Sequence, residues 1–300
     1  MRLQSGRPYS ETIMPNLIPT YDMVMAFLSF LRVRTATAWG DLNILGLQGM
    51  SPVGATAPDF VGTELALNAN VENEYNDTFV LASLSPTGRK QLSCFLGTVD
   101  PGATKVLGGI AHLTQGQHLY APGYHQSSTH GSDFPCLRGA DGVNRIWRRA
   151  EDGTCSVQTG KFGVNIHAGG SYQFVNNWSK GCGNICGNWT GTAYRRFLAL
   201  RDEHFRDGRK TSVGVTIWSG RDFTRFATEG WTMKPTLRFG MLTPWAGELQ
   251  GLLVKKGLFQ GTVDGDFGTK TLAAVQHLQG SVGLPADGVV GKLTWMALGA

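Results

Sequence analysis

Long apolar runs are scarce in this sequence. The run from Met23 to Leu31 covers nine residues, whereas a helix that crosses a bilayer needs about 20. Tracts of lysine and arginine are absent, and no nucleic-acid-binding motif is present, although the net charge is +5. Stable membrane insertion and nucleic-acid binding are therefore not expected. A weakly basic surface would still be attracted to an anionic polymer or surface.

Cysteine is rare as well. The 300 residues contain Cys94, Cys136, Cys155, Cys182 and Cys186. An odd number leaves at least one thiol unpaired even if the others form disulfides. Cys136 with Cys155 is the favoured bridge, yet Cys94 stands at a core position of a predicted strand, so a fully reduced chain is equally tenable.

The N-terminal apolar run has two interpretations. Its length suits the apolar segment of a signal peptide, and Ala36-Thr37-Ala38 resembles a cleavage site. However, Asp22 directly precedes the run, and Pro19-Thr20 makes a helix start. One helical face collects Tyr21, Val24, Met25, Leu28 and Leu31. We therefore expect an amphipathic helix packed on the domain that follows, with residues 1–20 as an N-terminal extension.

One histidine and one cysteine stand in a pattern typical of covalent catalysis. Residues 164–167 alternate apolar and polar side chains, which predicts a strand with Asn165 and His167 on one face. Cys182 follows, between Gly181 and Gly183. A thiol needs a base in order to attack at neutral pH, and glycines let a turn present N–H groups to an oxyanion. A buried cysteine and a hydrogen-bonded structural histidine are the alternative interpretation.

The setting of this cysteine resembles the L,D-transpeptidase catalytic domain family, because Ser179, Gly181, Cys182 and Asn184 match its Ser-x-Gly-Cys signature. The resemblance implies that Cys182 is the nucleophile and His167 the base. It also implies that a backbone carbonyl beside the histidine orients the imidazole. The sequence departs from the family at position 168, where alanine replaces the usual glycine, and in a shorter spacer before Ser179.

The match extends beyond this motif. Residues 97–102, 115–117 and 124–125 recur in the same order in a divergent branch of the family, found mainly in phage and bacterial wall proteins. The resemblance thus covers about residues 75–210. It places His125 near the cleft, so His125, Asn165 and Asn184 are the candidates for substrate binding. A solvated loop histidine is the alternative for His125.

The C-terminal segment carries the most specific pattern in the chain. Two Asp-Gly turns, at residues 264–265 and 287–288, form a weak internal repeat. Apolar residues at helical spacing predict three short helices: Leu249, Leu252, Leu253, Leu272, Val275, Leu278, Leu293 and Leu298. The segment resembles the small three-helix peptidoglycan-binding domain family. The resemblance implies wall binding, with the candidates Asp264, Asp266, Phe267 and Asp287; a purely structural helical domain is the alternative.

We expect an α+β fold in two domains, since 300 residues exceed what one core usually organises. A mainly-β, L,D-transpeptidase-like catalytic domain with flanking helices would cover residues 21–240, its core about residues 75–218. The three-helix domain would cover residues 241–300, whose four lysines balance four acidic residues. Strands are predicted at 78–84, 91–97, 145–149, 162–167 and 213–218, with a hairpin turn at 152–153 and a helix at 192–206.

A rival site is a cluster of histidines. His112, His118, His125 and His130 lie close together in the sequence, near Asp133 and Cys136. Zinc amidases and peptidases also cleave peptidoglycan. The spacings match no zinc signature, however, and ordinary exposed histidines are the favoured interpretation. No metal and no cofactor are therefore predicted.

These patterns together predict a cysteine-dependent peptidoglycan hydrolase of the phage endolysin type. Cys182 would attack a stem or cross-link peptide, and water would resolve the thioacyl enzyme. The alternatives are an L,D-transpeptidase, a zinc-dependent wall amidase or peptidase, and a wall-binding protein without activity. We expect a monomer whose partner is bacterial peptidoglycan. Its expected location is the host bacterial cytoplasm before release to the wall, with a secreted or periplasmic location as the alternative.

Overall fold

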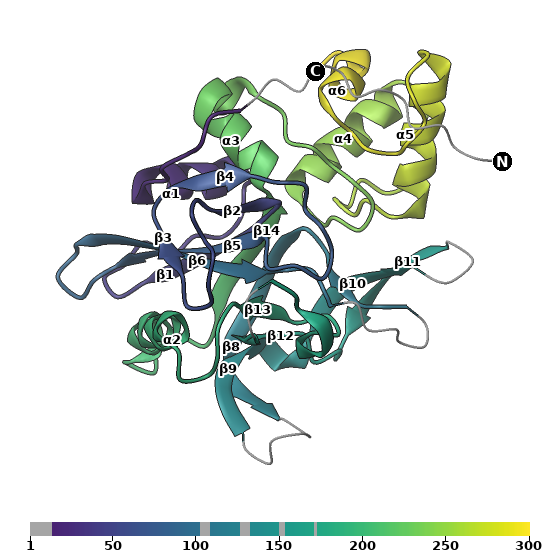
Figure 1. Ribbon diagram of the computed structural model, residues 1–300. Coiled ribbons are helices and arrows are strands. Elements are labelled where there is room, and N and C mark those ends of the chain that lie inside the picture. Colours follow the sequence, from purple (N-terminus) through teal and green to yellow (C-terminus); the bar gives the residue numbers. More distant parts are fainter. Residues whose placement is uncertain (1–13, 103–108, 127–132, 150–153, 171–172) are drawn as a thin grey trace.

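The computed structural model describes residues 14–102, 109–126, 133–149, 154–170 and 173–300. Its centre is a mixed sheet that curves into a barrel (Figure 1). The barrel strands are β1 (Leu42–Gln48), β5 (Asp77–Leu84), β6 (Lys90–Thr98), β8 (Gly116–Gln126), β9 (Asp133–Gly139), β12 (Asn165–Ala168), β13 (Gly183–Ile185) and β14 (Val213–Ser219). Their order is β6-β13-β12-β9-β8-β14-β1-β5, and β5 pairs with β6, which closes the circle. The α+β class is therefore confirmed, with mainly strands.

Most neighbours in the barrel are antiparallel, but β1 with β14 and β12 with β13 are parallel. Three smaller units lie beside the barrel. β3 (Val61–Gly62) extends the sheet from β6, β2 (Met50–Pro52) pairs with β4 (Leu65–Leu67), and β10 (Asn144–Arg149) lies between β7 (His112–Leu113) and β11 (Cys155–Gly160).

The predicted strands are confirmed with one change of boundary. The strand expected over 162–167 begins only at Asn165, because Gly163 adopts a left-handed conformation with φ of +66° that interrupts the extended backbone. The helix expected over 192–206 is α2 (Thr192–Phe205). The turn expected at 152–153 lies outside the described residues, as do residues 1–13 of the expected extension.

The strands of one side of the barrel are buried on both faces. In β1, Ile44 belongs to the cluster that fills the barrel, together with Phe79 and Tyr120. The alternate residues Leu45 and Leu47 belong to a second cluster outside it. This alternation explains why β1 reads as an almost continuous apolar run.

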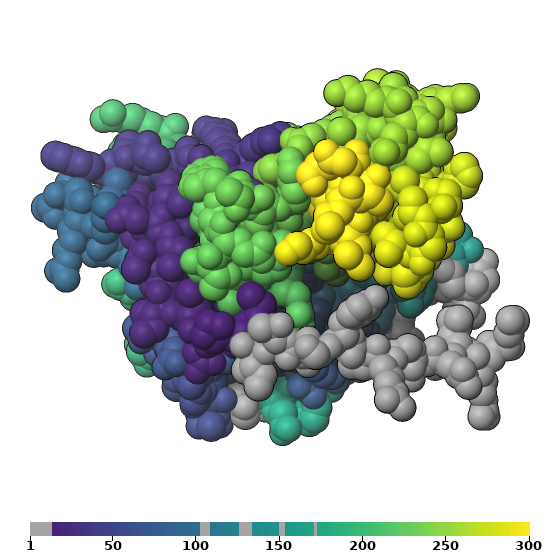
Figure 2. Space-filling model, turned by 90° about the horizontal axis from the view of Figure 1, so that it is seen from above, coloured from purple at the N-terminus to yellow at the C-terminus, as the bar shows by residue number. Residues whose placement is uncertain are grey.

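Helices cover that outer face. α1 (Tyr21–Phe30) begins at Thr20, whose side chain accepts a hydrogen bond from Met23 N, as the helix start predicted. α3 (Gly220–Glu229) packs beside it through contacts of Phe27 with Phe223 and Phe226. Figure 2 shows the purple N-terminal part beside the green part that holds α3, with the yellow C-terminal part on the other side of the green.

The C-terminal helices are α4 (Pro244–Lys255), α5 (Thr269–Ser281) and α6 (Lys292–Leu298), as predicted in number and order. Seven of the eight apolar positions expected in their core are buried or partly buried. Leu293 is the exception, because it is 50% exposed and Trp295 fills the core from α6 instead. The side chain of Trp295 is longer than that of Leu293, and its Nε1 also donates a hydrogen bond to Pro235 O at 2.8 Å.

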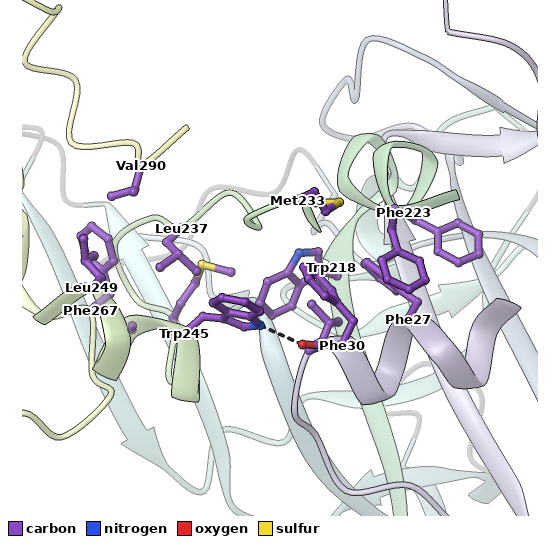
Figure 3. Close-up of a cluster of buried hydrophobic side chains, with 14 of the residues drawn as sticks. Phe27, Phe30, Trp218, Phe223, Met233, Leu237, Trp245, Leu249, Phe267 and Val290 are labelled. Carbon is purple, nitrogen blue, oxygen red and sulfur yellow. Dashed lines mark hydrogen bonds between the residues drawn. The ribbon is translucent and has the colours of Figure 1, made fainter. Parts of the chain in front are cut away.

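These helices do not form a separate core. Leu249 and Phe267 belong to the same buried cluster as Phe27, Phe30 and Trp218. Trp245 lies at the centre of this cluster and donates from Nε1 to Phe30 O at 2.9 Å (Figure 3). The segment before α4 also pairs with the C-terminal domain. Two isolated β-bridges join them, Leu237 with Val290 and Leu242 with Asp266.

Two expectations about the whole chain have structural outcomes. No helix among the described residues is long and apolar enough to cross a membrane. None of the five cysteines forms a disulfide, so the favoured Cys136–Cys155 bridge is not formed. Cys136 is buried on β9, whereas Cys155 lies on β11 in another sheet.

Candidate functional site

His167 and Cys182 come together through two neighbouring parallel strands. In the register of β12 with β13, His167 lies opposite Asn184. Cys182 directly precedes β13 and, by alternation, faces the same side as Asn184. Asn165 N donates to Cys182 Sγ at 3.4 Å, which fixes the cysteine beside the strand of the histidine.

The His167 ring is held by the backbone. Its Nδ1 lies 2.6 Å from Ala168 O, and because a carbonyl can only accept, Nδ1 must carry the proton. Nε2 is then the acceptor and faces the side-chain amide of Asn184 at 3.1 Å. The orienting carbonyl is the one implied by the sequence resemblance. It needs no glycine at position 168, because the backbone of any residue supplies it.

The electrostatics of the pair keep both groups neutral. His167 is 1% exposed. Burial, with His125 as a smaller cause, lowers the pKa of His167 to about 3. Burial also raises the pKa of Cys182 to about 11, although the hydrogen bond from Asn165 N acts in the opposite direction. At neutral pH the site therefore holds a thiol and an uncharged imidazole.

The thiol does not point at the imidazole in this conformation. Cys182 Sγ donates to Gly163 O at 3.6 Å. The hydrogen bonds among the described residues include none between Cys182 and His167. The two side chains share a face, but the thiol has to turn before a proton can pass between them.

Ser179 and Gly181 shape the turn that presents the cysteine. Ser179 Oγ accepts from Gly181 N at 3.1 Å and donates to Cys182 O at 2.6 Å, so it ties both sides of the turn. Ser179 is 1% exposed, which makes it a positioning residue. Gly181 has φ of +147°, and a Cβ there would lie 2.8 Å from Ala111 O. Only glycine fits this position without a shift of the backbone.

The predicted substrate-binding residues form a stacked layer over His167. The His125 ring stacks on His167 with centroids 4.2 Å apart, and Asn165 Nδ2 lies 3.1 Å from His125 Nδ1. Trp189, which the sequence analysis missed, stacks at 5.5 Å from His167. Asn165 Oδ1, Asn184 Oδ1 and Trp189 Nε1 are buried and have no hydrogen-bond partner among the described residues. This site therefore brings together His167, Cys182, His125, Asn165 and Asn184.

The rival histidine cluster is dispersed. His112 stacks on Trp147, buried His118 contacts Thr114 O through Nε2 at 2.8 Å, and His125 belongs to the site above. His130 lies outside the described residues. Within the described part of the chain, no three His, Cys, Asp or Glu side chains gather in a way that suits a metal ion.

The C-terminal helices carry two equivalent buried glutamines. Gln250 Nε2 donates to Asp264 Oδ1 at 2.8 Å and to Thr271 Oγ1 at 3.1 Å, while its Oε1 accepts from Gly265 N at 2.9 Å. Gln279 repeats this pattern in the second turn. Its partners are Asp287 Oδ1 at 2.8 Å, Thr294 Oγ1 at 3.3 Å and Gly288 N at 2.9 Å. The internal repeat seen in the sequence is thus a repeat of structure.

The residues expected to bind the wall have structural partners in this arrangement. Asp264 and Asp287 accept hydrogen bonds within the two turns. Asp266 forms an ion pair with Arg145 of β10 at 2.6 Å, and Phe267 is fully buried in the shared core. The structure thus gives all four residues a role in holding the domain and its docking.

Comparison with known proteins identifies the C-terminal part. Residues 246–298 match the model of a peptidoglycan binding domain family. A stretch of 36 residues is 64% identical to an uncharacterized protein from the bpoA1 3' region of Kitasatospora aureofaciens, covering 12% of this chain and 30% of that protein. No solved structure matches the chain significantly. The chain therefore carries a C-terminal peptidoglycan-binding domain, which supports association with the cell wall.

Proposed function

We propose that this protein is a cysteine-dependent peptide hydrolase that acts on bacterial peptidoglycan, in the manner of a phage endolysin. The observation that carries the proposal is the placement of Cys182 and His167 on one face of two adjacent parallel strands. The imidazole has its proton on Nδ1 and an acceptor at Nε2, as a general base requires. The peptidoglycan-binding domain supports the choice of substrate.

The reaction begins with a turn of the thiol from Gly163 O toward His167 Nε2, which displaces the Asn184 amide. Nε2 takes the thiol proton while Sγ attacks the carbonyl of a stem or cross-link peptide. The imidazolium then gives its proton to the departing amine, and an acyl group remains on Sγ. Water attacks this thioester with His167 again as base, which releases the acid and restores the thiol.

The developing oxyanion needs backbone donors near the turn. The Gly181 N–H is already engaged by Ser179 Oγ, so the Cys182 N–H is the donor we assign. The Asn184 amide, once displaced from His167 Nε2, would then contact the substrate. Transfer to a second amine in place of water would make the same site an L,D-transpeptidase, and the products distinguish the two outcomes.

The test is digestion of purified sacculi, with soluble muropeptides read by mass spectrometry. We expect new peptide fragments with the unaltered protein, none with Cys182→Ala or His167→Ala, and unchanged fragments with Cys94→Ala as the matched cysteine control. Cys94 is buried on β6 under α1, away from the site. A chelator should have no effect.

Two results would refute the proposal. Activity that survives in Cys182→Ala would exclude the cysteine as nucleophile. Binding to sacculi with no change in muropeptides would leave a wall-binding protein without hydrolase activity. Cross-links formed without addition of water would change the acceptor but keep the nucleophile.

A further inference from the structure

A cavity of about 290 Å³ lies between the barrel and the C-terminal domain, apart from the residues of the cysteine site. Asp100, Gln115 and His112 line it from the barrel side, and the turn at 287–289 lines it from the C-terminal domain. His112 stacks on Trp147 with centroids 4.1 Å apart, which gives the cavity a flat wall. Such a volume suits one small ligand or one end of a larger one.

Two buried acceptors in this cavity lack partners. Asp100 Oδ1 accepts from Gln48 Nε2 at 3.1 Å. Because a carboxylate only accepts, Gln48 must present its nitrogen to Asp100, and its Oε1 therefore accepts from Gln115 Nε2. This order leaves Asp100 Oδ2 and Gln115 Oε1 with no partner among the described residues. The two residues are 6% and 7% exposed, and Asn70, which also lines the cavity, is the nearby side-chain donor to Asp100. Full pairing of both acceptors therefore calls for further donors from a ligand or from water in the cavity.

The charges around these acceptors have both signs. Burial raises the pKa of Asp100 to about 6, and Glu72 adds to the rise. His112 does not compensate, because its Nδ1 lies 4.0 Å from Asp100 Oδ1 and burial lowers its pKa. Arg238 also lines the cavity and acts on Asp100 in the opposite direction. Its guanidinium has no hydrogen bond or ion pair within the described part of the chain. The cavity thus offers a carboxylate and a guanidinium that act on each other at a distance but form no direct ion pair, and Arg149 also lines it.

We propose that this cavity binds the ammonium and carboxylate groups of an amino acid, either free or at the end of a wall peptide. The ammonium lies against Asp100 Oδ2 and Gln115 Oε1, which both need donors. The carboxylate pairs with Arg238, whose planar guanidinium suits it. The apolar part of the ligand lies along Trp147.

The cavity is a neighbour of the nucleophile turn. Gly102 N, two residues after Asp100, donates to Ser179 O at 2.9 Å. Ala111 directly precedes His112 and lies close to Gly181. A Cβ on residue 181 would lie 2.8 Å from Ala111 O. A ligand in the cavity therefore orders segments that also contact the turn of Cys182.

The test uses the full chain with the substitution Cys182→Ala, so that binding is measured without turnover. L-alanine and meso-diaminopimelate are titrated by calorimetry, and the indole N–H signal of Trp147 is followed by NMR. N-acetyl-L-alanine and L-alanine amide serve as matched probes that lack the ammonium or the free carboxylate. We expect binding of the first two probes and loss of about tenfold or more in affinity with Asp100→Asn, which keeps the side-chain shape. Arg238→Gln should weaken L-alanine but not L-alanine amide.

The outcomes separate the sources and the alternatives. Tighter binding of soluble muropeptides than of free amino acids assigns the cavity to wall peptides, and the reverse assigns it to free amino acids. No binding of either zwitterion, equal binding of N-acetyl-L-alanine, or affinity unchanged in a folded Asp100→Asn variant overturns the proposal. Competition by Ca²⁺ would overturn it as well: added Ca²⁺ would then remove the shift that L-alanine causes in the indole N–H signal of Trp147. Because Cys182 is absent from the assay, failure of the hydrolase proposal and failure of this one remain distinct.

Discussion

Gln250 and Gln279 occupy equivalent positions, each with its side-chain amide bonded to the aspartate, the glycine N–H and the threonine of its own turn. Both are almost completely buried. A buried amide with every partner in place specifies one turn geometry, because any other geometry leaves polar atoms unpaired. The two glutamines therefore define the C-terminal domain as much as its apolar core does.

Replacement of Gln279 by leucine should lower the free energy of unfolding by about 3 kcal/mol, since it leaves the Asp287 turn without its partners. Urea denaturation followed by circular dichroism measures this. Gln276→Leu on the same helix is the control, because Gln276 makes a single bond of 3.4 Å to Ala286 O. An equal loss in both variants would contradict the role assigned to Gln279.

Alkylation of Cys182 by iodoacetamide should be slow at pH 7 and rise about tenfold per pH unit to pH 9. The reason is that burial raises the pKa of Cys182 to about 11, so the reactive thiolate fraction increases across this range. Peptide mapping by mass spectrometry reports Cys182 separately from the other thiols, and Cys182→Ala provides the blank. A rate already constant above pH 7 would mean an ionised thiol in the resting site.

Acidification should destabilise the protein through His167. The folded pKa is about 3, below the usual value of 6.5, so the unfolded chain takes up a proton that the folded chain refuses. Stability is therefore full above pH 6.5 and falls as the pH drops, by about 2 to 3 kcal/mol for this group between pH 6.5 and 4.5. Urea midpoints at these two pH values should differ less in His167→Gln. An equal pH dependence in the variant would assign the effect to other groups.

Trp245→Ala should cost about 3 to 5 kcal/mol, because the side chain is buried at the centre of the shared core. Trp245→Phe retains much of the packing and loses the bond to Phe30 O, so a smaller loss is expected. Since barrel and C-terminal helices share one core, thermal unfolding should show one transition by both fluorescence and circular dichroism. Two separate transitions would argue against a shared core.

Gly181→Ala should abolish most of the proposed wall-hydrolysing activity, since φ of +147° and the approach of Ala111 O both oppose a Cβ. Gly251→Ala is the matched control. Gly251 lies inside α4 with no atom within 4 Å of its would-be Cβ, so alanine there should stabilise the protein by about 0.5 to 1 kcal/mol. Both variants are compared by their activity on sacculi and by their urea midpoints. Full activity in Gly181→Ala would exclude a strained turn at Cys182.

Local patterns predicted the elements of this fold well. Apolar and β-branched segments bounded by turns marked the strands around Phe79 and Val215, and Thr20 marked the start of α1. Closure of the barrel was not predictable, because β13 and β6 are far apart in sequence and nothing local records the pairing of Asn184 with Thr98.

The candidate site was predicted in its residues but not in its detailed contacts. His167, Cys182 and the orienting carbonyl follow from a short motif. The Sγ contact with Gly163 O and the stacking of Trp189 depend on the course of loops, which no periodicity encodes. Gln250 and Gln279 were missed because a polar residue on a helix reads as solvent-facing. The signal shared by the two turns is an Asp-Gly pair with a threonine seven residues after the aspartate, Asp264 with Thr271 and Asp287 with Thr294.

The junction made by Trp245 and Phe30 has a consequence for reach. A binding domain on a loose linker lets its partner search a volume around the anchoring point, with a radius that grows with linker length. Here the core is continuous across the junction, so the distance and angle between the two units are set by packing. If the proposed hydrolase function holds, only bonds at one distance and one orientation from the wall-binding site can reach Cys182.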